Sequence, residues 1–437
     1  MWTYYPELLA RPVPRYTSFP TAAEFGTDVG EADLLHALED ATGHVSLYVH
    51  IPFCEKICWY CGCNTAAANR ASRLASYMDA LHSEIALMAE RLPRSAKVRR
   101  IAFGGGSPNA ITPDQFLRLF DDLAARFPLE EPVVSIELDP RSLTAEWTNV
   151  LANIGASHAS MGVQTFAPKL QAAIGRVQPT EMIERGVDIL RKGGVTSLNF
   201  DLMYGLPGQD QDDVSRSLDL AAQFGADRIA LFGYAHVPHM IARQRRIDDS
   251  ALPGAEERFA MAWLGYQQLQ GEGYVPVGFD HFALPGDPLA QAAEAGTLRR
   301  NFQGFTEDTA PVLLGLGASA ISGFPGLLAQ NDKNSGRYRM LLSQGHLPVA
   351  LGRRRTAEDQ RRGKVVEQLL CNRRTRIDAA LMMEAQARLS PYIERGLCEI
   401  SGGILTISDA ALPYARSIAA AFDPYRPDSP RIFSSAI

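Results

Sequence analysis

The sequence predicts an α/β fold: an open, partial parallel β/α barrel followed by a mainly helical C-terminal domain. One observation is that apolar, β-branched segments alternate with helical patterns over the first half of the chain. This alternation is typical of βαβ units, which build a parallel sheet. A second observation is that only six units precede about residue 240, which is too few for a complete eight-stranded barrel. The strand candidates begin near Val45, Val98, Val133, His158, Thr196 and Arg228.

The segments between these strands have the periodicity of amphipathic helices. Residues 71–92 place Leu81 and Ile85 on one apolar stripe. Thr112 followed by Pro113 predicts a helix start, because threonine caps a helix and proline suits its first position. Two further helices are expected over about 181–192 and 210–224, each ended by glycine.

The later part of the chain predicts a domain boundary near residue 330. The βα rhythm loosens after Gly254, and a glycine-rich stretch, 314–321, is expected to form a turn. The rest reads as mainly helical, with a small β element near 397–408. We therefore expect a barrel domain with its N-terminal segment over 1–330, and a mainly helical domain over 331–437.

Composition bounds the class of protein. The 437 residues are 46% hydrophobic and 21% charged, as in ordinary soluble domains. The net charge of −6 argues against nucleic acid as a partner. No apolar run reaches the roughly 18 residues that a membrane span needs, and the N-terminus lacks the pattern of a signal peptide. The expected location is the cytoplasm, where thiols stay reduced.

One loop after the first predicted strand gathers four of the six cysteines. Cys54, Cys58 and Cys61 have the spacing C-x3-C-x2-C, and Cys63 follows. Three thiolates can hold three irons of a cubic 4Fe–4S cluster and leave the fourth iron open, whereas electron-transfer clusters use four cysteines. The alternatives are a zinc knuckle or disulfides. Zinc sites favour a second knuckle or spaced histidines, and disulfides favour oxidising compartments.

Polar residues and glycines recur where the predicted strands end. In barrels this end carries the chemistry. Each feature alone could be structural: a tight turn, a capping acid or a buried hydrogen bond. Their recurrence at successive strands predicts a shared site, formed by Gly104–Pro108, Glu137 with Asp139, Gln164 with Arg176, Asp201 to Gly208, and Gly233 to Pro238.

The cysteine spacing, with an aromatic residue before Cys61, resembles that of the radical S-adenosylmethionine (radical SAM) enzymes. Nearly the whole chain resembles one family of them, the oxygen-independent coproporphyrinogen III oxidases. The marks of that family are the segments 14–20, 48–54, 61–63, 204–207, 234–236, 280–283 and 300–304.

The resemblance implies a set of site residues. Cys54, Cys58 and Cys61 would ligate the 4Fe–4S cluster, and Cys63 would not be a ligand. Two molecules of SAM would bind side by side. Ser107 stands where the family often has threonine, and Thr65 follows Asn64 where a lysine can occur, which leaves an anion contact there in doubt. The implied SAM contacts are Tyr48, Tyr60, Gly105, Gly106, Ser107, Glu137, Gln164, Arg176, Asp201, Ala235 and Ile321.

The resemblance also implies the reaction. A 5′-deoxyadenosyl radical made from SAM would start the oxidative decarboxylation of two propionates of coproporphyrinogen III to vinyl groups, giving protoporphyrinogen IX for haem synthesis. The substrate is a tetracarboxylate, so basic residues should neutralise it, and Arg15, Arg299 and Arg300 are the candidates. We expect a monomer without a membrane span, and an electron donor of the flavodoxin or ferredoxin type whose identity the sequence does not give.

Two other functions compete with this one. A sister group of haem chaperones keeps the cysteine triplet but generally lacks the segment 14–20 and ends the motif with Cys-x-Phe, so both marks favour the oxidase. A radical SAM methyltransferase or haem-degrading enzyme is the third alternative. Cys371 and Cys398 lie far from the motif and are interpreted as core residues, because free cysteine packs as a small hydrophobe.

Overall fold

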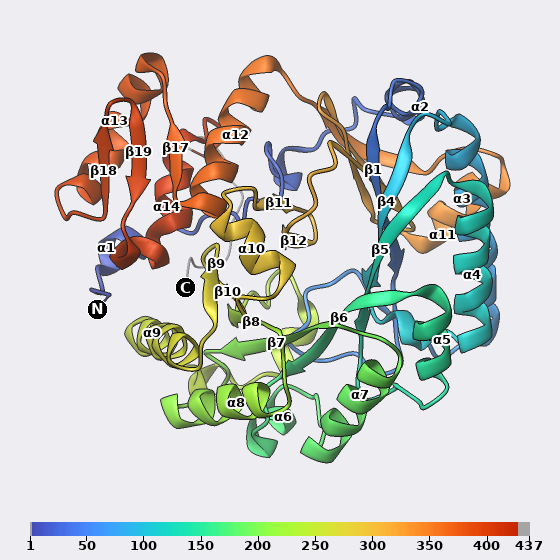
Figure 1. Ribbon diagram of the computed structural model, residues 1–437, viewed down its shortest axis with the longest axis horizontal. Coiled ribbons are helices and arrows are strands. Elements are labelled where there is room, and N and C mark those ends of the chain that lie inside the picture. Colours follow the sequence, from blue (N-terminus) through green and yellow to red (C-terminus); the bar gives the residue numbers. More distant parts are fainter. Residues whose placement is uncertain (1, 427–437) are drawn as a thin grey trace.

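The computed structural model describes residues 2–426, and its centre is a twelve-stranded sheet in the order β16-β15-β14-β13-β1-β4-β5-β6-β7-β8-β10-β9. The strands β13 to β8 in this order are parallel. The sheet curves without closing, and helices lie along its outer side (Figure 1). The open parallel barrel is therefore confirmed. All six expected strands are present: β1 (His44–Ile51), β4 (Lys97–Gly105), β5 (Leu129–Leu138), β6 (Ala156–Gln164), β7 (Ser197–Tyr204) and β8 (Arg228–Gly233).

The glycine-rich stretch 314–321 is not simply a turn, so that prediction was wrong in part. Its first half belongs to β13 (Val312–Leu316), which adds a seventh parallel strand beside β1, and Ile321 begins the next strand. Glycine is needed because a Cβ on Gly315 would lie 2.6 Å from the carbonyl oxygen of Ile321. The glycines therefore serve close strand packing as well as turning.

Short antiparallel strands extend the sheet at both edges. Strand β15 ends at Asn331 and pairs with β16, so the sheet continues past the expected boundary at residue 330. That division of the chain into two domains stays a prediction. The added strands are β14 (Ile321–Gly323), β15 (Leu327–Asn331) and β16 (Val349–Arg354) at one edge, and β9 (Val275–Val277) and β10 (His281–Ala283) at the other.

The helices of the barrel begin and end close to the expected residues. Thr112 caps α4, accepting a hydrogen bond from the backbone N–H of Gln115, whose side chain in turn accepts one from the N–H of Thr112. Asp210 caps α8 in the same reciprocal way. The barrel helices are α3 (Ala71–Arg91), α4 (Pro113–Arg126), α5 (Trp147–Ile154), α6 (Pro168–Ala173), α7 (Thr180–Lys192), α8 (Gln211–Gln223), α9 (Ala255–Gly271) and α11 (Ser335–Ser343).

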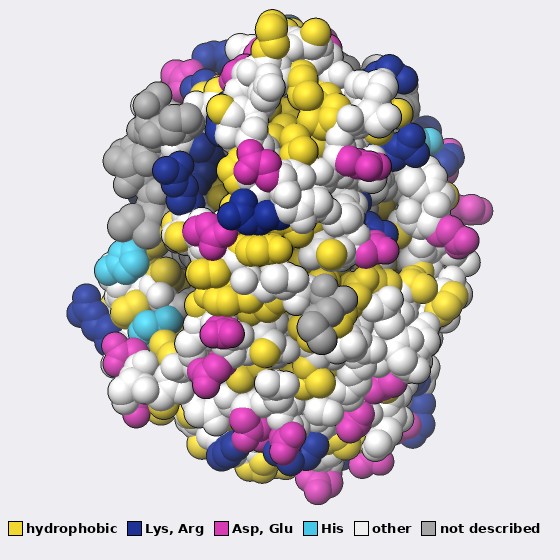
Figure 2. All heavy atoms as spheres, turned by 90° about the vertical axis from the view of Figure 1, so that its left-hand side faces the viewer, with side chains coloured by type: hydrophobic (Ala, Val, Ile, Leu, Met, Phe, Trp, Pro, Cys, Tyr) yellow, Lys and Arg dark blue, Asp and Glu magenta, His cyan; other side chains and the backbone are white. Residues whose placement is uncertain are grey.

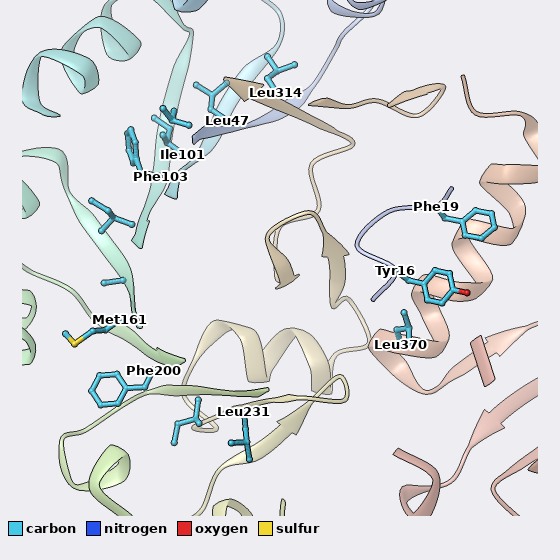
Figure 3. Close-up of a cluster of buried hydrophobic side chains, with 14 of the residues drawn as sticks. Tyr16, Phe19, Leu47, Ile101, Phe103, Met161, Phe200, Leu231, Leu314 and Leu370 are labelled. Atoms are coloured by element: carbon cyan, nitrogen blue, oxygen red, sulfur yellow. The ribbon is translucent and has the colours of Figure 1, made fainter. Parts of the chain in front are cut away.

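The hydrophobic core consists of aliphatic and aromatic side chains that pack against the sheet. Leu47, Ile101, Phe103 and Phe200 come from β1, β4 and β7 and have at most 1% of their surface exposed. Figure 3 shows these side chains following one another across the strands. This continuous apolar layer holds the strands in register, so the strand ends form a stable platform.

The C-terminal part is mainly helical and carries a three-stranded sheet in the order β17-β19-β18. It packs on the N-terminal segment, since Tyr16 Oη donates to a carboxylate oxygen of Asp423 at 3.0 Å. Basic and acidic side chains alternate on the face shown in Figure 2, without one dominant sign. The elements are α12 (Ala357–Asn372), α13 (Ala379–Ile393), α14 (Ala415–Ala419), β17 (Arg374–Arg376), β18 (Cys398–Ser401) and β19 (Ile404–Ile407).

The remaining elements are short. No helix within residues 2–426 is both long and apolar enough to cross a membrane. The short elements are α1 (Pro6–Leu9), α2 (Glu31–Glu39), α10 (Pro288–Glu294), β2 (Phe53–Cys54), β3 (Ala66–Ala67), β11 (Arg299–Asn301) and β12 (Gly304–Thr306).

Candidate active site

A cavity of about 640 Å³ lies at the C-terminal ends of the parallel strands. The cysteine loop forms one wall, the ends of β4 to β8 form the floor, and residues 233–244 form the opposite wall. Most of the predicted site residues line it: Cys54, Cys58, Cys61, Tyr60, Gly105, Gly106, Glu137, Gln164, Arg176, Asp201 and Ala235.

The cysteine loop is tied to the barrel by its backbone. Cys54 lies in β2, whose pairing with β3 brings the N–H of Ala68 to the carbonyl oxygen of Cys54 at 2.9 Å. The N–H of Trp59 donates to the carbonyl oxygen of Ile174 at 3.0 Å, which anchors the middle of the loop. The three motif cysteines therefore face the cavity from a fixed loop.

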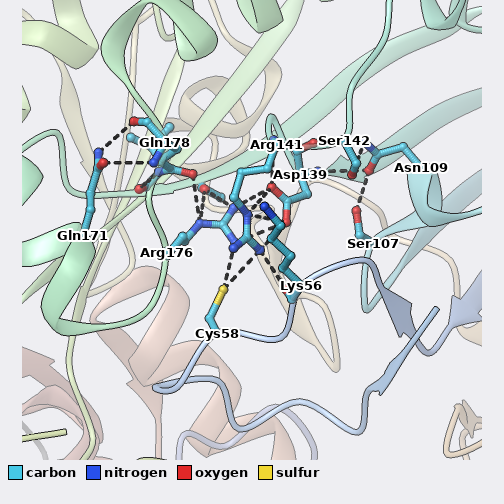
Figure 4. Close-up of polar contacts among 12 residues, drawn as sticks. Lys56, Cys58, Ser107, Asn109, Asp139, Arg141, Ser142, Gln171, Arg176 and Gln178 are labelled. Carbon is cyan, nitrogen blue, oxygen red and sulfur yellow. Dashed lines mark hydrogen bonds and ion pairs between the residues drawn. The ribbon is translucent and has the colours of Figure 1, made fainter. Parts of the chain in front are cut away.

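Two positively charged arginines donate hydrogen bonds to the sulfur of Cys58. Arg141 Nη2 and Arg176 Nη1 each donate to Cys58 Sγ at 3.2 Å (Figure 4). Both guanidinium groups also pair with Asp139, at 2.6 Å and 3.3 Å, which fixes their orientation. Cationic neighbours stabilise a thiolate, the form that binds metal.

The other thiols of the motif differ in how readily they lose a proton. Hydrogen bonding from Cys63 lowers the pKa of Cys61 to about 6, and the backbone N–H of Cys63 lies 3.4 Å from Cys61 Sγ. Burial, with the neighbouring Cys61, raises the pKa of Cys54 to about 12. Metal binding displaces such a proton because the metal stabilises the thiolate. Cys63 thus assists a neighbour and is itself exposed.

The donor set fits an iron–sulfur cluster better than the alternatives. All six cysteines are free thiols, so the structure contains no disulfide among them. Within residues 2–426, no three His, Cys, Asp or Glu side chains are placed to hold one metal ion, as a zinc knuckle would need. A cubic cluster sets its ligands further apart, because each thiolate binds a different iron. Cys54, Cys58 and Cys61 all line one wall of the cavity, where each could bind a different iron.

Two carboxylates face the cavity from neighbouring parts of the sheet. Glu137 Oε2 accepts the backbone N–H of Gly105 at 3.1 Å. Asp201 accepts hydrogen bonds from Ser160 Oγ at 3.1 Å and Asn199 Nδ2 at 2.8 Å. Burial and then the charge of Asp201 raise the pKa of Glu137 to about 7. The pair can accept hydrogen bonds from hydroxyl or ammonium groups of a ligand.

The glycines at the end of β4 are required by close backbone approach. Gly105 has φ of +108°, and a Cβ there would lie 2.4 Å from the imidazole of His50. A Cβ on Gly106 would lie 2.4 Å from the carbonyl oxygen of Phe53. Ser107 is buried below them and does not line the cavity; its backbone N–H donates to that same oxygen at 2.7 Å.

The structure leaves Tyr48 and Ile321 outside the cavity lining. Tyr48 Oη lies 3.1 Å from His50 Nδ1, and Tyr48 is opposite Gly315 in the pairing of β1 with β13. Ile321 lies directly behind Gly315. Tyr48 and Ile321 therefore lie on either side of Gly315, in the strands β1 and β14 that flank β13.

Sequence reasoning missed two side chains that shape the site. Arg141 follows the strand-end pair Asp139-Pro140, and its position two residues after an acid was the available signal. Gln244 Nε2 donates to the carbonyl oxygens of Tyr60 at 2.8 Å and Ala235 at 3.1 Å, joining the two walls. Gln244 lies in a short 3-10 helix, Ala242–Arg246, whose sequence has no apolar periodicity, so nothing in the sequence indicated it.

The three arginines predicted to neutralise the substrate separate in the structure. Arg15 lines the cavity. Arg299 is exposed and pairs with Glu367 at 2.8 Å. Arg300 stacks on the ring of Phe305, with 4.3 Å from its guanidinium carbon to the ring centroid, outside the cavity.

Comparisons with known proteins agree with this arrangement. The family model of the radical SAM superfamily matches residues 48–221, which include the cysteine loop and the strands β4 to β7. The fold and site thus define a radical SAM enzyme.

The similarity to individual proteins extends over nearly the whole chain. An oxygen-independent coproporphyrinogen III oxidase of Bradyrhizobium diazoefficiens is 40% identical over 97% of each chain. A protein of the same name from Pseudomonas aeruginosa is 38% identical over 95% of this chain and 94% of its own. The solved coproporphyrinogen III oxidase of Escherichia coli, a radical SAM enzyme, superposes with a TM-score of 0.90 at 34% identity, covering 97% of this chain and 99% of that one. The chain belongs to the family of oxygen-independent coproporphyrinogen III oxidases.

Proposed function

We propose that the chain decarboxylates two propionate side chains of coproporphyrinogen III to vinyl groups without oxygen, giving protoporphyrinogen IX. Each event removes one hydrogen atom from the carbon β to the carboxylate, releases CO2 and passes one further electron to an acceptor. The observation that carries the proposal is one cavity that combines three cysteines, two arginines on Cys58 and two buried carboxylates. Membership of the family implies a 4Fe–4S cluster and SAM.

We propose Cys54, Cys58 and Cys61 as the cluster ligands. When bound, the cluster and SAM would supply a 5′-deoxyadenosyl radical that takes the hydrogen atom. Arg141 and Arg176 would offset the negative charge of the thiolates, because each already donates to Cys58. Cys63 is excluded as a ligand in this proposal, since its backbone N–H supports Cys61 instead.

We propose that SAM lies across the strand ends. Glu137 and Asp201 would accept hydrogen bonds from its hydroxyl or ammonium groups, and Gly105 and Gly106 would let it approach the backbone. The remaining proposed contacts are Tyr48, Tyr60, Ser107, Gln164, Arg176, Ala235 and Ile321. The proposal includes a second SAM molecule beside the first.

We also propose the compartment, the oligomeric state and the electron donor of the enzyme. Free thiols at all six cysteines suit a reducing compartment such as the cytoplasm. We propose that the enzyme is a monomer and that a protein of the flavodoxin or ferredoxin type donates its electrons.

The test is an anaerobic assay of the reconstituted protein with dithionite, SAM and coproporphyrinogen III. Protoporphyrinogen is the expected product, and tight haem binding without product would instead favour a haem chaperone. Cys58→Ser should abolish the visible absorbance of the cluster and product formation. Cys63→Ser, a change in the same loop, should keep the absorbance; loss of it would contradict the ligand assignment.

A further inference from the structure

A smaller cavity of about 60 Å³ adjoins the active-site cavity. Arg15, Phe232, Gly233 and Ala235 line both, so the two spaces share one wall. A polar cavity needs only about 10–15 Å³ to hold one water, so this one has room for a group of carboxylate size. The outer walls come from the two ends of the chain, at Trp2 and at 412–416.

Arginine dominates the charge of this smaller cavity. Arg15, Arg258 and Arg416 line it, and Asp280 is the acid among its lining residues. That acid is already held by His281, whose Nδ1 lies 2.6 Å from Asp280 Oδ1. The described lining therefore carries more positive than negative charge. The cost of this charge is largest at Arg416, which is 9% exposed, whereas Arg15 is exposed.

Two buried hydrogen-bond donors in this region have no acceptor among the described residues. Arg258 uses Nη2 to donate to the carbonyl oxygen of Tyr234 at 2.7 Å, while its Nε is buried and has no hydrogen-bond partner in the described residues. Arg300 lies beside the cavity, and its buried Nη1 is likewise without a partner there. Buried donors normally find acceptors, so these atoms point to a ligand with acceptor oxygens.

Two of the arginines each lie over one aromatic ring. The guanidinium carbon of Arg15 lies 5.5 Å from the ring centroid of Phe232, and that of Arg416 lies 5.5 Å from the centroid of Phe279. Burial and the charge of Arg15 lower the pKa of Arg416 to about 10. An anion beside these two positive charges would stabilise both, and Arg416 most, because charge interactions are larger where water is excluded.

We propose that this arginine pocket (Arg15, Arg258 and Arg416) binds one propionate carboxylate of the substrate and so sets the position of the tetrapyrrole over the active-site cavity. The inference rests on the proposed function. Arg15 is the residue that faces both cavities and would contact the carboxylate. Arg300 is a positioning residue, because its Nε donates to the carbonyl oxygen of Arg15 at 3.2 Å. Arg299 is not part of the pocket.

The first test compares Arg15→Ala, Arg15→Lys and Arg11→Ala. A hydrogen bond to a charged group contributes enough for Arg15→Ala to raise the KM for coproporphyrinogen about 10- to 100-fold. Arg15→Lys should recover part of the loss. Arg11 is an exposed arginine of the same segment that lines neither cavity, so Arg11→Ala should keep the wild-type KM.

The second test changes the ligand. Coproporphyrin III, the fluorescent oxidised form, should bind wild-type protein more tightly than its tetramethyl ester, and the ratio of the two dissociation constants should shrink about tenfold in Arg15→Ala. An unchanged KM together with an unchanged ratio would overturn the proposal. A wild-type protein that makes no protoporphyrinogen would instead refute the proposed function, so the two failures are distinguishable.

Discussion

Glu84, in the middle of α3, is the sharpest place to test how this fold tolerates a buried charge. The side chain is 1% exposed. It accepts three hydrogen bonds, from the N–H of Gly317 at 2.7 Å, from Tyr338 Oη at 2.6 Å and from Asn331 Nδ2 at 2.6 Å. Burial is the largest influence and raises its pKa from the ordinary 4.5 to about 7.

The sign of the pH effect follows from that raised pKa. The folded protein holds the Glu84 proton more tightly than the unfolded chain does, so the stabilisation is fully present below about pH 4.5 and is lost as the pH rises through about 7. One pKa unit corresponds to about 1.4 kcal/mol. Between pH 5 and 8, ionisation of Glu84 should therefore remove about 3 kcal/mol from the free energy of unfolding.

The variant Glu84→Gln isolates this contribution. Its amide cannot ionise, but it turns one acceptor into a donor, so at pH 5 it should be less stable than wild type by about 1–3 kcal/mol. The deficit should shrink or reverse by pH 8. The assay is urea unfolding followed by tryptophan fluorescence at both pH values. Glu90→Gln, an exposed change in the same helix, is the control. If Glu84→Gln were less stable than wild type by the same amount at pH 5 and pH 8, the reasoning would be refuted. The three hydrogen bonds to Glu84 would then lower its pKa as much as burial raises it.

Three more predictions concern the active-site cavity. Asn109→Ala removes the hydrogen bonds that its side chain makes with the backbone of Asp139, at 2.9 and 3.1 Å, and should lower the free energy of unfolding by about 2–3 kcal/mol in urea titrations. Gly105→Ala should lower SAM affinity at least tenfold in equilibrium binding, because its Cβ would overlap the imidazole of His50; Gly43→Ala, also at positive φ but with open space, should not. Because burial and the charge of Asp201 raise the pKa of Glu137 to about 7, SAM should bind more tightly as the pH rises from 6 to 8, whereas Glu137→Gln should show no such trend in the same titration.

Much of the barrel could be predicted from the sequence because local and long-range preferences agree there. The six expected strands are apolar and are bounded by turns, and Thr112 and Asp210 cap helices where their side chains predict it. The prediction that the cysteine loop binds three irons of a cluster and leaves the fourth iron open also depends only on the spacing of the cysteines. The strand ends gather at one cavity because parallel strands all end on the same side of the sheet.

The remaining features depend on contacts that a single segment does not encode. β13 contains Gly315, and glycine normally argues against a strand; only the close approach of Ile321 explains it. Arg15 lines the cavity whereas Arg299 and Arg300 do not, although all three are equally basic. Which arginine faces the cavity depends on how the N-terminal segment packs against the C-terminal part, a contact between residues about four hundred positions apart.

That contact has a consequence for the order of synthesis. Tyr16 is held by Asp423, which is 407 residues later in the chain, so the wall that carries Arg15 can form only when almost the whole polypeptide has been made. Contacts of such long sequence separation are slow to form, because a large loop must close first. Until then the cysteine loop has only the barrel beside it. The active-site cavity therefore stays open on the side that Arg15 lines until synthesis of the chain is nearly finished.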